Sequence, residues 1–144
     1  MGLTDLIQKE LGRRKKIRPF QAFLHYSDAD SAILTISIPP SDNHYYAVAR
    51  GRKIISKEGR EYKESARKLL RPVTIQGRIR ADVTVHARDK RRRDLNNLNK
   101  CLFDTLENCG FYPDDANIDD SRIRRGSVDE RHFLSVVIER IKDD

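Results

Sequence analysis

A regular alternation of apolar and polar residues marks two segments of the chain. Residues 33–38 alternate apolar with small polar side chains until Pro39-Pro40 interrupts them, and residues 78–86 alternate apolar with charged or polar side chains. A period of two is typical of a strand with one buried face, and proline cannot continue a strand. The pattern predicts strands at both places, and two more strands are predicted at residues 118–124 and 133–141.

A hairpin and a helix are predicted between the first two strands. Residues 41–43 favour a turn, and Arg50-Gly51-Arg52 favours the turn of a hairpin. Ser56 can cap a helix that runs to about Leu70, before Pro72 closes the segment.

A second helix is predicted after residue 94. Asp94 is a suitable N-cap, and Gly110 is typical of the position just past a helix. Between them, leucines recur at helical spacing, at Leu95, Leu98, Leu102 and Leu106. The order strand, hairpin, helix, strand, helix, strand, strand predicts an α/β (α+β) fold, a single small domain with a mixed β-sheet and two main helices.

The first 30 residues differ from this pattern, and we interpret residues 1–30 as an N-terminal extension of a domain at residues 31–144. Thr4 could cap a short helix, and the basic run at residues 12–16 follows it. Such a segment could be an extra arm for nucleic acid or a solvated terminus, and both readings stay open.

The size and composition of the chain fit one globular domain, because 144 residues with 38% hydrophobic content can bury a core of their own. No apolar run approaches the roughly 18 residues of a membrane span, and the N-terminus lacks the apolar core of a secretory signal. We therefore expect a cytoplasmic protein with no membrane partner. Cys101 and Cys109 would lie about 12 Å apart along one helix, so we expect both to be reduced. The four scattered histidines do not indicate a zinc site.

The charge of the chain favours a polyanionic partner. Lysine and arginine number 29 against 22 acidic residues, which gives a net charge of +7. Each phosphate contact of a basic protein releases counterions, so this balance is compatible with nucleic-acid binding. Charge alone does not establish it.

The segment from Arg91 to Asp115 carries candidate chemistry. A basic run meets Asp94 where the second helix begins, Lys100 shares a helix face with Asn96, and Asp115 lies in the loop after the helix. Hydrolysis of a phosphodiester by a divalent metal needs hard oxygen ligands, and a lysine can add positive charge beside them. The same residues also have plainer explanations: Asp94 as a helix cap, Asp115 as part of a turn, and the arginines as a solvated loop.

Several longer motifs narrow the range of possible functions. Residues 38–46, 56–62, 91–100, 103–106 and 110–115 together resemble the RusA family of Holliday junction resolvases, and the resemblance extends over residues 33–141. It implies a small α/β domain that forms a homodimer and makes paired nicks in four-way DNA junctions with Mg²⁺, for which Mn²⁺ can substitute. It also implies a bacterial or prophage-type protein without a nucleotide cofactor.

The resemblance implies roles for individual residues. Asp94, Asn96, Lys100 and Asp115 fall on the catalytic positions, and the first, second and fourth of these fall on the metal ligands. Asn96 departs from the family pattern, which has an acid there. Three explanations compete: an engineered inactivation, a natural site in which another acid compensates, or a silent junction-binding protein. The candidates for compensation are Asp114, Asp119 and Asp120.

We expect DNA contacts from two groups of side chains. Tyr45 and Tyr46 could stack on splayed bases, although at least one of them could instead pack in the core. The candidates for phosphate contacts are Arg52, Lys53, Arg91, Arg92 and Arg93.

A twofold dimer would supply two sites for two symmetric nicks. A helix over residues 95–109 would be about 22 Å long, and the six residues after it reach at most about 20 Å. We therefore also consider a site that combines Asp94 of one subunit with Asp115 of its partner.

Three classes of function compete. The first is a junction endonuclease, the second is a DNA-binding module without catalysis, and the third is a basic structural protein of a ribonucleoprotein particle. The combination of Asp94, Lys100 and Asp115 favours the endonuclease, since a binding module gains nothing from acids beside phosphates.

Overall fold

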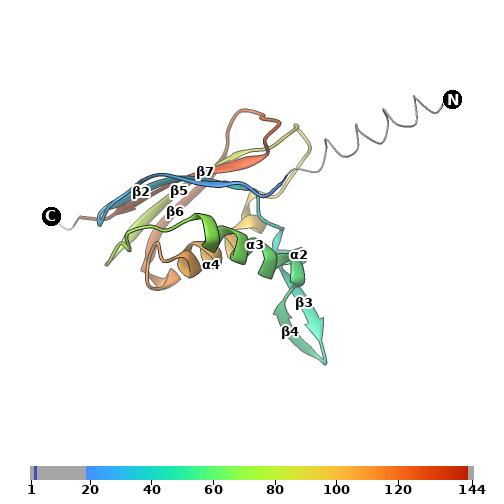
Figure 1. The fold of residues 1–144 in the computed structure, drawn as a ribbon, viewed down its shortest axis with the longest axis horizontal. Coiled ribbons are helices and arrows are strands. Elements are labelled where there is room, and N and C mark those ends of the chain that lie inside the picture. The colour runs from blue at the N-terminus through green and yellow to red at the C-terminus, as the bar shows by residue number, and fades with distance from the viewer. Residues whose placement is uncertain (1, 3–18, 143–144) are drawn as a thin grey trace.

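A five-stranded mixed β-sheet forms the body of the protein in the computed structural model, which describes residues 2 and 19–142 (Figure 1). The strand order is β1-β2-β7-β5-β6, and only β5 and β6 run parallel. The strands are β1 (Ala22–Ser27), β2 (Ser31–Ser37), β5 (Ile79–His86), β6 (Ile118–Arg125) and β7 (Phe133–Arg140). The predicted helix at Thr4 and the basic run at residues 12–16 lie outside the described residues.

Two helices, α3 (Lys57–Leu69) and α4 (Asn99–Cys109), cover one face of the sheet (Figure 1). The alternation of β5 places its odd-numbered residues on this face, where all four are buried. Side chains of β2 and β7 meet the same helices, so the core lies between the sheet and the helix layer.

The predicted strands, the hairpin and both helices are confirmed. The hairpin consists of β3 (Tyr46–Ala49) and β4 (Arg52–Ile55), and the hydroxyl of Ser56 accepts a hydrogen bond from the Gly59 N–H as the cap of α3. Gly110 ends α4 with a φ of 93°, a left-handed conformation that glycine adopts without strain.

Three local predictions differ from the structure. Residues 41–43, predicted as a turn, overlap the single-turn helix α2 (Asp42–Tyr45). The second helix begins as the 3₁₀ turn η1 (Leu95–Leu98) before α4 follows. Finally, β1 pairs with β2, so the sheet already includes residues 22–27 of the predicted extension. A separate extension remains a prediction only for residues upstream of the sheet.

The opposite face of the sheet carries no helix among the described residues (Figure 1). Toward β1 and β2 this face carries apolar side chains among uncharged polar ones: Phe23 is 63% exposed, and Ile33 lies opposite Val137 of β7. Toward β5 and β6 it is charged, since Arg80 forms an ion pair of 2.9 Å with Asp120. The uncovered face is therefore partly apolar toward β1 and β2 and charged toward β5 and β6.

Within the described part of the chain, none of the helices combines the length and the apolar character needed to cross a bilayer. Cys101 and Cys109 are both free thiols, as predicted, and burial raises the pKa of Cys101 to about 12 and that of Cys109 to about 11.

Gly59 allows α2 to pack closely on α3. A Cβ at this position would lie 2.6 Å from Cδ1 of the buried Tyr45 ring. Alanine normally favours a helix over glycine by about 1 kcal/mol. At Gly59→Ala we expect the opposite sign, a loss of about 1–3 kcal/mol in the free energy of unfolding, because the ring must move.

Urea unfolding followed by circular dichroism measures this loss. The matched control is Glu64→Ala, an exposed position of the same helix, which should change stability by less than about 0.5 kcal/mol. A Gly59→Ala protein that is more stable than the unmodified one would contradict the proposed close packing.

Candidate active site

Lys100, near the start of α4, lies close to two acidic residues. Nζ of Lys100 lies 3.3 Å from Oδ1 of Asp104, one turn along the helix, and 3.9 Å from Oδ2 of Asp115. The coulombic attraction of Asp104 raises the pKa of Lys100, and Asp115 adds to this effect. Lys100 therefore keeps its charge at neutral pH, beside the two acids.

Asp115 also belongs to an acidic cluster that we define as Glu107, Asp114 and Asp115. Carboxylate oxygens of the three residues lie within 4.8 Å of one another. The Asp115 N–H donates a hydrogen bond of 2.8 Å to Oε1 of Glu107, and Asp114 caps the 3₁₀ turn η2 (Asp115–Asn117). Oxygen atoms at such separations can share one hard cation.

Glu107 is a member of this cluster that the motifs did not indicate. It follows Lys100 by seven residues, which is close to two full helical turns. A search of the helix face that carries Lys100 would therefore have found both Asp104 and Glu107.

A reversal of the chain after α4 brings Asp115 back toward Lys100. Gly110 adopts a positive φ, and the Phe111 N–H donates to the Leu106 carbonyl at 3.1 Å. The α-helical part is also shorter than predicted, because it begins at Asn99. The approach of Asp115 to Lys100 thus occurs within one chain, and a site that combines Asp94 and Asp115 from two subunits remains a prediction.

Asp94 caps the 3₁₀ turn η1. Its Oδ1 accepts a hydrogen bond of 3.0 Å from the Asn96 N–H, and both side chains are exposed. Within residues 19–142, no hydrogen bond or ion pair joins Asp94 or Asn96 to Lys100 or Asp115. Capping uses one carboxylate oxygen, so it does not prevent the other from binding a metal, and this role remains a prediction.

The acids considered as substitutes for a carboxylate at position 96 differ in their surroundings. Asp119 is paired with Arg78, and Asp120 with Arg80 at 2.9 Å and with Arg122 at 3.5 Å. Asp114 belongs to the acidic cluster instead. Of the three, it has the surroundings that suit a metal ligand.

A further carboxylate, Asp42, lines a surface hollow together with Tyr46, Lys53 and Lys100. Burial raises the pKa of Asp42, while the backbone N–H groups of Lys100 and Cys101 oppose this rise. Its Oδ1 atom is buried without a hydrogen-bond partner among the described residues. The motifs did not indicate this residue, because its environment depends on how α2 packs against α4.

The two neighbouring tyrosines have different environments. Tyr45 is fully buried, and its hydroxyl donates a hydrogen bond of 2.9 Å to Oδ2 of Asp104. It cannot stack on DNA bases in this structure, so we correct that assignment to core packing. Tyr46 is half-buried, with Nζ of Lys53 lying 4.0 Å above its ring centroid. Lys53 and Arg52 are exposed on β4.

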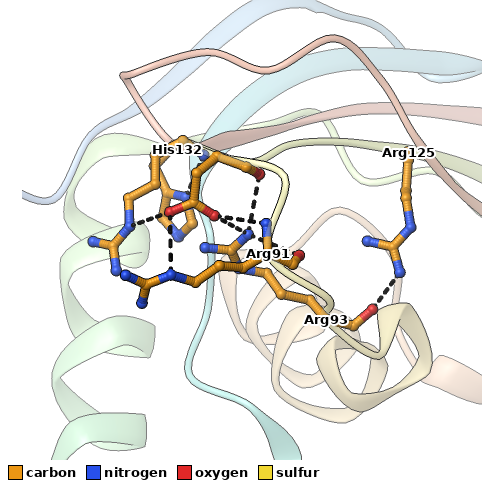
Figure 2. Close-up of polar contacts among 6 residues, drawn as sticks. Arg91, Arg93, Arg125 and His132 are labelled. Carbon is orange, nitrogen blue, oxygen red and sulfur yellow. Dashed lines mark hydrogen bonds and ion pairs between the residues drawn. The ribbon is translucent and has the colours of Figure 1, made fainter.

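Asp89 organises the basic loop, which we define as residues 87–94 (Figure 2). Its carboxylate lies 2.8 Å from Nη1 of Arg93 and 3.8 Å from Nε of Arg91. Arg93 also donates to the backbone carbonyls of Asp89 and Arg91, and Arg125 donates to the Arg93 carbonyl. Nδ1 of His132 accepts from the N–H of Arg88 at 3.0 Å.

These contacts give different roles to the three arginines that we expect to bind phosphates. The side chain of Arg93 is only 24% exposed and holds the loop together, whereas Arg91 and Arg92 are exposed. With Lys90 and Arg125, Arg91 and Arg92 line a second surface hollow. Arg91 and Arg92 are thus better placed than Arg93 for contact with a polyanion.

Comparisons with known proteins agree with one another. Residues 37–139 match the model of the family described as "Endodeoxyribonuclease RusA". The chain is 35% identical over 109 residues to the crossover junction endodeoxyribonuclease RusA of Shigella sonnei and 34% identical to that of Escherichia coli strain K12. It is 35% identical to the protein of that name from Enterobacteria phage 82, and each of these alignments covers 73% of this chain and 91% of the relative.

The contacts of Asp89 have a measurable electrostatic consequence. The hydrogen bond from Arg93 is the main reason why the pKa of Asp89 falls from 3.8 to about 2. Because the pKa is lower in the folded protein than in the unfolded one, the charged carboxylate stabilises the loop above a pH of about 4. This contribution should be lost as the pH falls toward 2.

An NMR titration of the side-chain carboxyl carbons should show this midpoint for Asp89. In an Arg93→Ala variant the midpoint should return toward 3.8, while that of Asp129, which Arg131 lowers to about 2, should not move. An unchanged Asp89 midpoint in the variant would mean that another group holds the carboxylate.

Proposed function

The chain belongs to the RusA family of endodeoxyribonucleases, and from this premise we propose that it is an endonuclease that cuts four-way DNA junctions. The observation that carries the proposal is the position of a charged lysine of α4 beside the acidic cluster. The curated relatives are named crossover junction endodeoxyribonucleases. Because these relatives come from bacteria and a phage, we expect the protein to act in the cytoplasm of a bacterium.

We propose that the acidic cluster takes part in holding a divalent metal ion. The donor atoms are carboxylate oxygens, which suit Mg²⁺ and also Mn²⁺. Asp115 belongs to this cluster, and we retain Asp94 and Asn96 as ligands implied by the family pattern. When bound, such an ion makes a water molecule more acidic and neutralises charge on the phosphate.

Lys100 would act on the phosphodiester directly. Its ion pairs with Asp104 and Asp115 hold Nζ at the edge of the acidic cluster. A positive charge there stabilises the negative charge that develops on the phosphate, and the ammonium can donate a proton to the leaving oxygen. The basic loop would hold the DNA backbone nearby through Arg91 and Arg92.

Asn96 supports a second candidate function, a silent protein that binds branched DNA. An amide supplies one neutral oxygen where the family pattern has a carboxylate, so metal affinity should be lower. Asp114 offers a carboxylate within the acidic cluster that could compensate. We favour the endonuclease because Lys100 and Asp115 lie together, an arrangement that junction binding alone does not need.

The decisive experiment compares the unmodified protein with Asn96→Asp on a four-way junction over a range of Mg²⁺ concentrations. If the site is functional, both proteins should nick the junction in pairs. The Mg²⁺ concentration that the variant needs should be about tenfold lower or less, because an added ligand charge strengthens metal binding. Asp115→Asn should abolish cutting and leave junction binding intact.

The matched control is Asp119→Asn, which removes an acid that is paired with Arg78 outside the cluster. It should cut at the rate of the unmodified protein. Cutting by Asn96→Asp alone would identify a disabled nuclease. Tight binding without cutting by both proteins would favour the silent junction-binding protein.

We also propose that the protein acts as a homodimer. A twofold dimer supplies two equivalent sites for the two nicks that resolve a junction. The uncovered sheet face carries Phe23, Ile33 and Val137 on the side away from the acidic cluster, and a second copy of the chain would cover these apolar side chains.

Phe23→Glu should therefore weaken the dimer, because it places a charge in an apolar interface. Sedimentation velocity should show a dimer for the unmodified protein and a monomer for the variant, with unchanged far-ultraviolet circular dichroism. Val128→Glu alters an exposed valine outside the sheet and should leave the dimer intact. A dimer that persists in Phe23→Glu would place the interface elsewhere.

A further inference from the structure

The β3–β4 hairpin is separate from the main sheet. Its strands pair only with each other, and Figure 1 shows it projecting from the body beyond α2. At its tip, Arg50 and Gly51 have φ angles of 52° and 74°. Two successive residues with positive φ are typical of the tight turn that joins twisted strands, so the hairpin ends in a narrow tip.

One face of this hairpin is exposed and partly apolar. Val48 is 78% exposed, and it lies opposite Lys53 in the register of the two strands. Lys53 in turn lies over the Tyr46 ring. Because side chains alternate along a strand, Tyr46, Val48 and Lys53 share one face. All three line the hollow that also contains Lys100, so this face leads to the candidate active site.

The charge of the hairpin indicates what kind of partner it meets. Residues 46–55 contain three basic residues and no acidic one. A partner must therefore offer negative charge together with apolar surface for Val48. Duplex DNA covers its base faces by stacking, whereas base pairs at a branch point can expose theirs next to phosphates. Apolar side chains are known to enter between base steps and to unstack them.

We propose that the β3–β4 hairpin is a wedge that enters the branch point of a DNA junction. Val48 packs against a base face at the crossover, while Arg50 and Arg52 contact the flanking phosphates. The strand that leaves the branch point then passes through the hollow toward Lys100. This inference rests on the proposed function, and it assigns the recognition of the branch to a different element from the one that carries the acidic cluster.

The test uses a four-way junction with 2-aminopurine at the crossover, and a linear duplex of the same length, both in EDTA so that no metal-dependent cutting occurs. Binding of the unmodified protein should raise the fluorescence, because unstacked 2-aminopurine is brighter. Val48→Ser should largely remove this rise and lower the preference for junction over duplex by about fivefold. Val73→Ser, at an exposed valine outside the hairpin, should change neither quantity.

Two further variants separate apolar contact from hairpin stability. Val48→Thr keeps a β-branched side chain but replaces one methyl group by a hydroxyl, so it should lose the fluorescence rise, while Val48→Ile should retain it. A full rise with Val48→Ser and Val48→Thr, in a protein that still prefers junctions, would overturn the wedge and leave the proposed function standing. If the unmodified protein showed no preference for junctions, the wedge and the proposed function would both be wrong. A change from dimer to monomer in Val48→Ser would also overturn the wedge, since the hairpin would then be a protein interface.

Discussion

The parallel pairing of β5 with β6 determines where the candidate site lies. Parallel neighbours cannot be joined by a tight turn, so the chain must cross over the sheet between them. This crossover includes η1, α4 and η2. The basic loop leaves β5 and the acidic cluster precedes β6, which places them at opposite ends of one helix. The reversal at Gly110 then returns Asp115 along that helix to Lys100.

Charge is distributed unevenly over the molecule, although its net value is positive. The basic loop and the hairpin would attract a phosphate backbone, whereas the acidic cluster would repel it. A cation removes this conflict, because it can be shared by carboxylate and phosphate oxygens. The positive charge of the Lys100 side chain also reduces the repulsion between the acidic cluster and the phosphates. Within this arrangement, metal binding and DNA binding should each strengthen the other.

The sequence predicted the elements whose signal is local. Alternation located β2 and β5, and the caps at Ser56 and Asp94 located the starts of the helical segments. The sequence did not predict strand β1, because a bulge between Leu24 and Tyr26 breaks its alternation. The motifs also predicted Lys100 and Asp115 as site residues, and the structure brings these two together. Asp42 takes its importance from the packing of α2 against α4, which no local pattern records. Asp89 and Glu107 lie close in sequence to the side chains they accompany, but the motifs did not single them out.

The crossover also has a consequence for the order in which parts of the protein fold. Pairing β5 with β6 requires closure of the whole segment between His86 and Ile118, and contacts between distant parts of a chain tend to form late in folding. The hairpin and the basic loop depend mainly on neighbours close in sequence, and they can form earlier. The contacts of Lys100 with Asp104 and Asp115 are also local in sequence, so they do not depend on this pairing. The late pairing of β5 with β6 would therefore attach to the sheet a site whose own contacts already exist.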